Sequence, residues 1–249
     1  MGVKVEAERE IVYPESDGKP MADNTLQARY IVYIYDALEG LFRDNPNVFV
    51  AADLLWYPVE GEPNIRVAPD VMVAFGRPKG DRRSYLQWRE EDIPPQVVFE
   101  VWSPSNTLRD FVDKLNFYER YGVEEFYLYD PDVGRFEGWI RQGDKLVPIE
   151  NTQGWSSPRL GIKFILEGKD LVLYSASSER ILTYPELRRQ LMELRNQFEL
   201  ERQRAEQERQ RAEQERQRAE QERKRAEQER QRAERLAQRL RELGIEPEE

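Results

Sequence analysis

The sequence predicts an α/β fold, in which a mixed sheet is flanked by helices and followed by one long charged helix. A strand-like run over residues 96–102 precedes a helical pattern and a second strand-like run over residues 125–130. A strand, a helix and a strand in this order form a crossover, which makes the two strands parallel. Near Pro185 charged heptads replace the globular pattern, and this change predicts the long helix.

The composition limits the chemistry that the chain can perform. Its 249 residues are 39% hydrophobic and 35% charged, with a formal net charge of −10, which fits one globular domain and a charged appendage. It contains neither cysteine nor histidine, so disulfides, thiolate sites and imidazole catalysis are excluded. An enzyme built from this chain must use carboxylates, lysine, tyrosine, hydroxyl groups or a cation bound by oxygen atoms.

The globular part should begin with a helix and continue mainly as strands. The expected elements are a helix over residues 25–42, strands within 48–59, 66–75, 96–102 and 125–130, and further strands over 135–174. Asp23 or Asn24 is the expected N-cap of the first helix. EGEPN, residues 60–64, predicts a hairpin turn, and further turns are expected at Gln142–Gly143 and Glu167–Gly168.

The crossover helix is predicted from apolar residues at helical spacing: Leu108, Phe111, Val112, Leu115 and Tyr118. Before it, residues 103–107 read SPSNT. These hydroxyl side chains are expected to end the strand and to cap the helix, because a chain without histidine offers only lysine as a base for a serine nucleophile.

The tail carries the repeat ERQRAEQ from Glu201 onward, with 17 basic and 17 acidic residues after Pro185, so the whole net charge lies in residues 1–185. One row of heptad core positions carries leucine, phenylalanine and alanine side chains. The other row carries leucine at its two ends and glutamate in its middle. A coiled coil prefers apolar residues in both rows, but charged pairs at i,i+4 support a solvated helix. A dimeric coiled coil and a free-standing helix both remain open, and the helix should stop near Gly244.

Glu100 is the most unusual residue, because it lies in the middle of the strand-like run QVVFEVW. Alternation places it on one strand face with Val98 and Trp102, and burying an unpaired carboxylate is costly. If the strand of Asp70 is its sheet neighbour, two carboxylates converge where the amine of Lys114 arrives from the crossover helix. Two acids and a backbone carbonyl, that of Val101, suit Mg²⁺ or Mn²⁺, and the lysine could orient or deprotonate an attacking water.

These residues carry a family resemblance. Pro69–Asp70 followed by Glu100 resembles the PD-(D/E)XK superfamily, and the string PDVMV…VVFEVWSPSNT…DFVDKLNFYERYGVEEFYLYDPD is similar to its Uma-two-type branch of restriction-endonuclease-like proteins. The resemblance covers roughly residues 21–175 and is specific over 66–132. It implies the restriction-endonuclease-like αβββαβ core, with Asp70 and Glu100 as metal ligands. Trp102 stands where the motif has its lysine, so the lysine role passes to Lys114.

Other residues are expected to support this site. Asp110, one turn before Lys114, should hold the amine in position and favour its charged form, although an ordinary surface pair explains it too. Asp53 could add a third carboxylate, or could simply face outward. The segment 76–95 lies between the two proposed ligands in the sequence, so it should project near the site. Its interleaved basic and aromatic side chains make it a candidate nucleic-acid contact or a solvated loop. Its candidate contact residues are Arg77, Lys79, Arg82, Arg83, Tyr85 and Trp88.

The expected organisation is an N-terminal extension (1–20), a nuclease-like domain (21–185), the long helix (186–244) and a short tail (245–249). The function expected is that of a Mg²⁺-dependent endonuclease acting on phosphodiester bonds, with DNA as the first choice of substrate. The alternative is a catalytically inactive nucleic-acid-binding or assembly module that uses the tail for oligomerisation. The chain shows no apolar run long enough to span a membrane, so we expect a cytoplasmic protein without a membrane partner. We also expect a homodimer, with the long helix as a candidate dimer contact.

Overall fold

The computed structural model describes residues 11–242 and divides the chain into two units, Met1–Tyr184 and Pro185–Glu249. Of the predicted N-terminal extension, residues 1–10 lie outside the described part, and so do the expected helix stop at Gly244 and the tail 245–249. Across the described residues, no helix combines the length and apolar character needed to cross a membrane.

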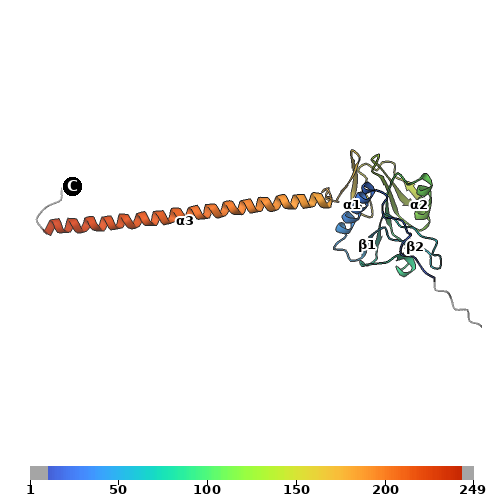
Figure 1. Cartoon of the computed structure of the whole chain (residues 1–249), viewed down its shortest axis with the longest axis horizontal. Helices are drawn as coiled ribbons and strands as arrows, with labels where there is room; N and C mark the ends of the chain where they lie inside the picture. The colour runs from blue at the N-terminus through green and yellow to red at the C-terminus, as the bar shows by residue number, and fades with distance from the viewer. Residues whose placement is uncertain (1–10, 243–249) are drawn as a thin grey trace, which may run out of the picture. The chain divides into compact units, whose positions relative to one another are not determined.

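The first unit is a mixed α/β domain built on a six-stranded sheet (Figure 1). Its order is β1-β3-β5-β6-β7-β8, and only the pair β5–β6 is parallel. The strands are β1 (Val48–Ala52), β3 (Val71–Phe75), β5 (Val97–Val101), β6 (Glu125–Asp130), β7 (Arg135–Gln142) and β8 (Lys145–Pro148). The parallel pair is joined through α2 (Leu108–Arg120), which confirms the predicted crossover. Together with α1 (Thr25–Leu41), these elements give the predicted αβββαβ order.

Two smaller sheets accompany the main one. β9 (Lys163–Glu167) and β10 (Asp170–Tyr174) form an antiparallel hairpin, whereas β2 (Trp56–Tyr57) and β4 (Tyr85–Leu86) form a short parallel pair. A 3₁₀ turn, η1 (Gln87–Arg89), follows β4. The predicted turns at Gln142–Gly143 and Glu167–Gly168 are confirmed, and both glycines take the left-handed backbone that such turns favour, with φ of +62° and +67°.

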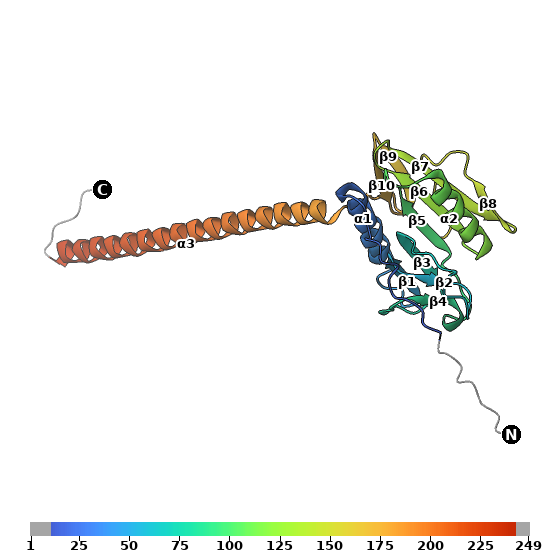
Figure 2. The same cartoon turned by 45° about the vertical axis from the view of Figure 1, so that its right-hand side comes forward.

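Alternating side chains of the sheet form two cores, one on each face. Val97, Phe99 and Val101 pack into the core shared with α1 and the β9–β10 hairpin. Val98 packs into the other core, below α2, with Trp102 against it. In Figure 2, α1 and α2 are seen on the two sides of the sheet. Glu100 therefore projects from the α2 face, as the alternation predicts.

Two strand predictions are too long. The run 48–59 breaks at Asp53, whose φ of +50° is unusual for a residue other than glycine, so that β1 and β2 are separate strands. Asp70 lies just before β3 rather than inside a strand. The EGEPN turn is present, but only one antiparallel bridge, Trp56 to Val67, closes it before the chain enters β3.

The second unit is formed by the helix α3 (Tyr184–Glu242), which has 59 residues. Figure 1 shows this helix as uninterrupted. Ion pairs at i,i+4 join side chains along it, such as Lys224 with Glu220 at 2.8 Å and Arg230 with Glu234 at 3.2 Å. Its first turns expose a row of large apolar side chains at heptad spacing, each 45–66% exposed: Leu187, Leu191, Leu194 and Phe198.

A carboxylate, lysine and tyrosine cluster at the ends of β3 and β5

Asp70 and Glu100 come together because β3 and β5 are antiparallel, so the start of one strand lies beside the end of the other. Val71 is the register partner of Phe99, which places Pro69 opposite Val101. Proline has no backbone N–H, so it cannot extend the ladder. The Val101 N–H instead donates to Asp70 Oδ2 at 2.6 Å. The missing proline N–H leaves the Val101 carbonyl for another donor, while Asp70 satisfies the Val101 amide at the end of the strand pairing.

The Val101 carbonyl is bound by a side chain that the sequence did not single out. Gln27 of α1 donates from Nε2 to this carbonyl oxygen at 2.8 Å, and its Oε1 accepts the backbone N–H of Asp23 at 2.8 Å. Gln27 is only 6% exposed. A possible signal was its helical spacing with Tyr30, Ile31 and Ile34 on the buried face of α1. The amide thus fixes the end of β5 to the start of α1.

Glu100 is held by two groups from α2. Lys114 Nζ donates to Glu100 Oε2 at 2.5 Å, and the Tyr118 hydroxyl donates to Glu100 Oε1. The spacing i,i+4 puts both donors on one helix face. The Glu100 side chain is 6% exposed, that of Lys114 is 30% exposed, and Tyr118 is fully buried. The structure therefore brings the predicted lysine to the predicted glutamate and adds the tyrosine.

The electrostatics of this cluster show a shortage of positive charge. Burial, together with the charge of Glu100, raises the pKa of Asp70 well above its usual range. Burial would lower the pKa of Lys114, but the charges of Glu100 and Asp70 outweigh it and the pKa rises. Burial and the neighbouring Glu100 charge likewise raise the pKa of Tyr118 well above its usual value. At neutral pH both partners of Glu100 are therefore proton donors.

The cluster opens into a cavity of about 640 Å³. Its lining includes six acidic residues, Asp17, Asp23, Asp53, Asp70, Glu100 and Asp110, against three basic ones, Lys19, Arg66 and Lys114. Asp53 lines this cavity too, and its pKa is raised by burial and by the Asp17 charge. Asp70 Oδ1 has no hydrogen-bond partner within the described residues. In the same part of the chain, no group of three or more acidic, histidine or cysteine side chains forms a ready-made metal cage.

Asp110 has a different direct partner from the one predicted. It forms a capping box with Thr107, the N-cap of α2, and accepts from the Thr107 backbone N–H at 2.8 Å and from its hydroxyl at 2.6 Å. These bonds lower the pKa of Asp110. Its charge still favours the charged form of Lys114 through space. The prediction that residues 103–107 end the strand and cap the helix is confirmed.

The segment 76–95 does not reach the cavity, contrary to expectation. It joins the end of β3 to the start of β5, whereas Asp70 and Glu100 lie at the other ends of these strands. None of its residues lines the cavity. The sequence order between Asp70 and Glu100 was therefore a poor guide to distance, because an antiparallel connection runs away from the site before it returns.

Most candidate contact residues of this segment are already engaged within the protein. Arg77 and Arg82 both bind Glu90, at 3.1 Å and 2.7 Å, and Lys79 binds Glu39 at 2.8 Å. The prediction for Tyr85 as a contact residue is wrong, because its ring is fully buried below the sheet. Trp88 packs against Tyr13, with 5.0 Å between ring centroids. Arg83 is the most exposed of the cations, at 84% of its side chain, and pairs with Glu15.

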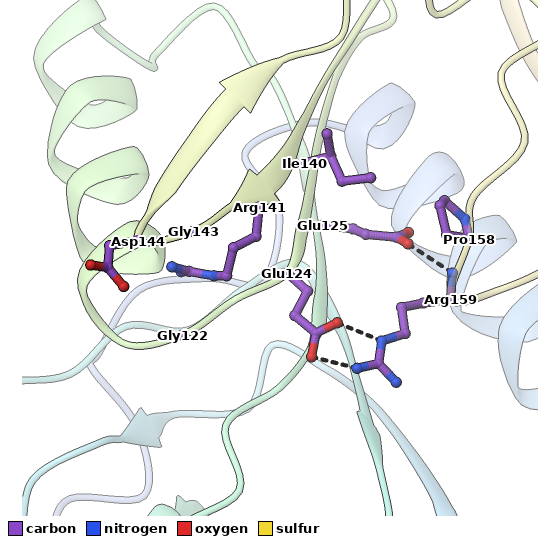
Figure 3. A pocket seen from close by; sticks show the side chains of 9 residues that line it. All are labelled: Gly122, Glu124, Glu125, Ile140, Arg141, Gly143, Asp144, Pro158 and Arg159. Atoms are coloured by element: carbon purple, nitrogen blue, oxygen red, sulfur yellow. Dashed lines mark hydrogen bonds and ion pairs between the residues drawn. The ribbon is translucent and has the colours of Figure 1, made fainter.

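A second hollow, of about 690 Å³, lies at the opposite end of β5 and β6 (Figure 3). Arg159 binds Glu124 through two nitrogens at 2.5 Å, and its backbone N–H donates to Glu125. Arg141 donates to backbone carbonyls at the end of α2. Because these charges are satisfied by one another and by the backbone, this hollow is a structural joint, and the cavity at Glu100 is the candidate site.

Comparison with known proteins gives one family match and one described structure. The family model of Uma2, whose description is "Putative restriction endonuclease", matches residues 7–166. No curated protein matches the chain. Among solved structures, the crystal structure of "a putative nuclease belonging to DUF820" from Anabaena variabilis ATCC 29413 is similar, with a TM-score of 0.43 and 14% identity. The similarity covers 57% of this chain and 76% of that chain.

Proposed function

Because this chain belongs to the Uma2 family, described as "Putative restriction endonuclease", we propose that it is a metal-dependent endonuclease that hydrolyses phosphodiester bonds in DNA. The observation that supports this proposal best is the convergence of Asp70, Glu100 and Lys114 at one cavity, from three separate elements. A buried carboxylate pair with only one cation beside it is costly for folding, and such costs are typical of functional sites.

The residues present fit a hard divalent cation, Mg²⁺ or Mn²⁺. Asp70, Glu100 and the Val101 carbonyl offer oxygen ligands, and Asp70 lines the acidic cavity while its Oδ2 accepts the Val101 N–H. Mg²⁺ usually takes one or two carboxylates and keeps several waters, so two acids are sufficient. When bound, the cation would supply a Lewis acid for a phosphoryl oxygen and lower the pKa of a coordinated water.

Lys114 acts as a charged donor in this proposal. Its ammonium holds Glu100 in place through the 2.5 Å contact and is positioned to stabilise negative charge on the phosphoryl group. Both roles that the sequence left open, orienting an attacking water or removing a proton from it, are compatible with this position. Tyr118 holds the second oxygen of Glu100 and keeps that carboxylate in one orientation.

The test is cleavage of plasmid DNA in Mg²⁺ or Mn²⁺ by the wild type and by Asp70→Asn, Glu100→Gln and Lys114→Met. Two variants outside the cavity serve as matched controls: Lys145→Met, which breaks a lysine–glutamate pair of 2.6 Å, and Glu125→Gln, which neutralises a buried carboxylate. We expect the three site variants to lose at least about 100-fold in rate and the controls to stay near wild type. Equal cleavage by all six proteins would show a contaminating nuclease and refute the proposal.

The second candidate is a catalytically inactive nucleic-acid-binding or assembly module. One observation favours it: both carboxylate oxygens of Glu100 are already hydrogen-bonded, by Lys114 and Tyr118. Titration calorimetry with Mn²⁺ separates the candidates, because the inactive module should give no binding heat that depends on Asp70. Binding heat in the wild type that is lost in Asp70→Asn would reject the inactive module.

We also propose that the chain forms a homodimer through α3. The exposed row of Leu187, Leu191, Leu194 and Phe198 supports this proposal, because heptad-spaced apolar side chains stabilise a helix by packing on a second copy. Light scattering should give twice the chain mass for the wild type and a lower mass for Leu191→Glu with Phe198→Glu. A monomer mass for both proteins would favour the free-standing helix.

A further inference from the structure

Two half-buried aromatic rings line the cavity beside the carboxylates. Trp102 follows Glu100 by two residues, and Phe111 belongs to the first turns of α2. The rings contact each other edge to face, with 6.4 Å between centroids. Phe111 also packs on Trp139, at 5.2 Å, and Trp139 does not line the cavity. One wall of a strongly acidic cavity is therefore aromatic.

Two other apolar side chains of α2 are exposed but do not belong to this wall. Leu108 and Val112, which the sequence placed on the buried face of this helix, are 75% and 43% exposed, and neither lines the cavity. The aromatic wall therefore consists of Trp102 and Phe111.

The charges of this domain give little attraction for a duplex. Proteins that bind double-stranded DNA rely on cations that neutralise many phosphates. Residues 1–185 carry the whole net charge of −10. Two arginines of segment 76–95, Arg77 and Arg82, are already bound to Glu90. The cavity itself offers Lys19 and Arg66 in addition to Lys114. Much of the affinity must therefore come from contacts other than those to phosphate.

We propose that Trp102 and Phe111 stack on an unpaired base of the strand to be cleaved. This inference rests on the proposed nuclease function and names its substrate class, a strand that is single-stranded or locally unpaired at the cleavage position. Paired bases are hidden in the duplex, whereas an unpaired base can lie on an aromatic face whatever its sequence. The cavity of about 640 Å³ lies within the usual range for a pocket that takes a small molecule. Lys19 and Arg66 then contact phosphates on either side of the stacked nucleotide.

The test uses binding without cleavage. A single-stranded oligonucleotide carrying 2-aminopurine, and the same oligonucleotide in a duplex, are titrated with the full chain in EDTA and again in Ca²⁺. Stacking of the 2-aminopurine on Trp102 or Phe111 quenches its fluorescence, and anisotropy of an end label gives the affinity. The variants are Trp102→Leu, Trp102→Phe, which keeps an aromatic face, and Trp139→Leu, which removes a ring of the same cluster outside the cavity. Thermal melting of each variant checks its fold.

We expect the wild type to prefer the single strand and to quench it. Trp102→Leu should weaken that binding about 5- to 140-fold, which is the usual loss of one base–aromatic stack, while Trp102→Phe and Trp139→Leu stay near wild type. Equal affinity for single strand and duplex, or equal losses in Trp102→Leu and Trp139→Leu, would overturn the inference. The binding titration is independent of the plasmid cleavage assay, so the two proposals can fail separately. Stacking in the titration without cleavage in the assay would refute the proposed function alone. Cleavage of duplex DNA without stacking would refute this inference alone.

Discussion

Replacing Lys114 by methionine should destabilise the globular domain far more than the same change at Lys145. Both lysines bind a glutamate at nearly the same distance, 2.5 Å for Lys114 with Glu100 and 2.6 Å for Lys145 with Glu119. The side chains of the first pair are 30% and 6% exposed, whereas those of the second are 74% and 21% exposed. Methionine keeps the apolar stem of lysine, so the variants differ from wild type mainly in charge.

The size of the effect follows from this difference in burial. Two charges about 4 Å apart attract by about 4 kcal/mol at an effective dielectric constant of 20. Because Lys114 is partly open to solvent, screening reduces the loss, but Glu100 would be left buried with one neutral donor and the Asp70 charge nearby. We expect Lys114→Met to cost about 2–3 kcal/mol and Lys145→Met about 0–1 kcal/mol.

Urea unfolding followed by tryptophan fluorescence measures both free energies. All five tryptophans lie before Pro185, so the signal reports the globular domain and not α3. In the double variant Lys114→Met with Glu100→Gln, the glutamine still accepts from Tyr118 and no charge is left at position 100, so about 1 kcal/mol or more should return. A loss for Lys114→Met within about 0.5 kcal/mol of that for Lys145→Met, or a double variant weaker than the single one, would refute the reasoning.

Three further predictions follow from the same contacts. Burial and Glu100 raise the pKa of Asp70, so ionisation of Asp70 should lower the stability of the domain as pH rises from about 3.9, the unfolded pKa, through the raised pKa of the folded state. Calorimetry of Asp70→Asn without metal should lack this fall in stability. Mn²⁺ should raise the Tm of the wild type but not that of Asp70→Asn. Tyr118→Phe leaves a buried oxygen of Glu100 without its donor and should cost about 1–3 kcal/mol in urea unfolding, and a loss below about 0.5 kcal/mol would contradict this. Thr107→Ala removes the capping box and should cost about 1 kcal/mol at pH 7; because bonds from Thr107 lower the pKa of Asp110, the difference from wild type should shrink as pH falls below about 3.9, and a constant difference would contradict it.

The order of elements and the direction of Glu100 were predictable because both depend on short-range patterns. Successive side chains of the strand QVVFEVW point to opposite faces, which places Glu100 with Val98 and Trp102. The capping box of Thr107 and Asp110 marks the start of α2. A strand, a capped helix and a strand admit few topologies. The convergence of Asp70 and Glu100 then follows from one assumption, that their strands are antiparallel neighbours.

The remaining features depend on contacts that no local pattern contains. Gln27 meets the Val101 carbonyl across 74 residues of sequence, and nothing near Gln27 announces that partner. Arg77 and Arg82 look like solvent-exposed cations in the sequence, yet both fold back onto Glu90. Tyr85 lies in a stretch rich in charge, but the pairing of β4 with β2 buries its ring. Composition indicates which groups are available, and only the tertiary fold determines which of them bind one another.

The residues that end the β3–β5 ladder also bring two carboxylates together. Pro69 has no N–H for the backbone pairing, and Asp70 accepts the Val101 N–H, which brings a second carboxylate into the region of Glu100. One lysine cannot balance two buried carboxylates, and Tyr118 adds a hydrogen bond without charge. A purely structural joint of this kind would gain stability from a second cation or from fewer acids. The shortage of positive charge beside Asp70 and Glu100 is therefore the physical reason for the proposed Mg²⁺ or Mn²⁺ site.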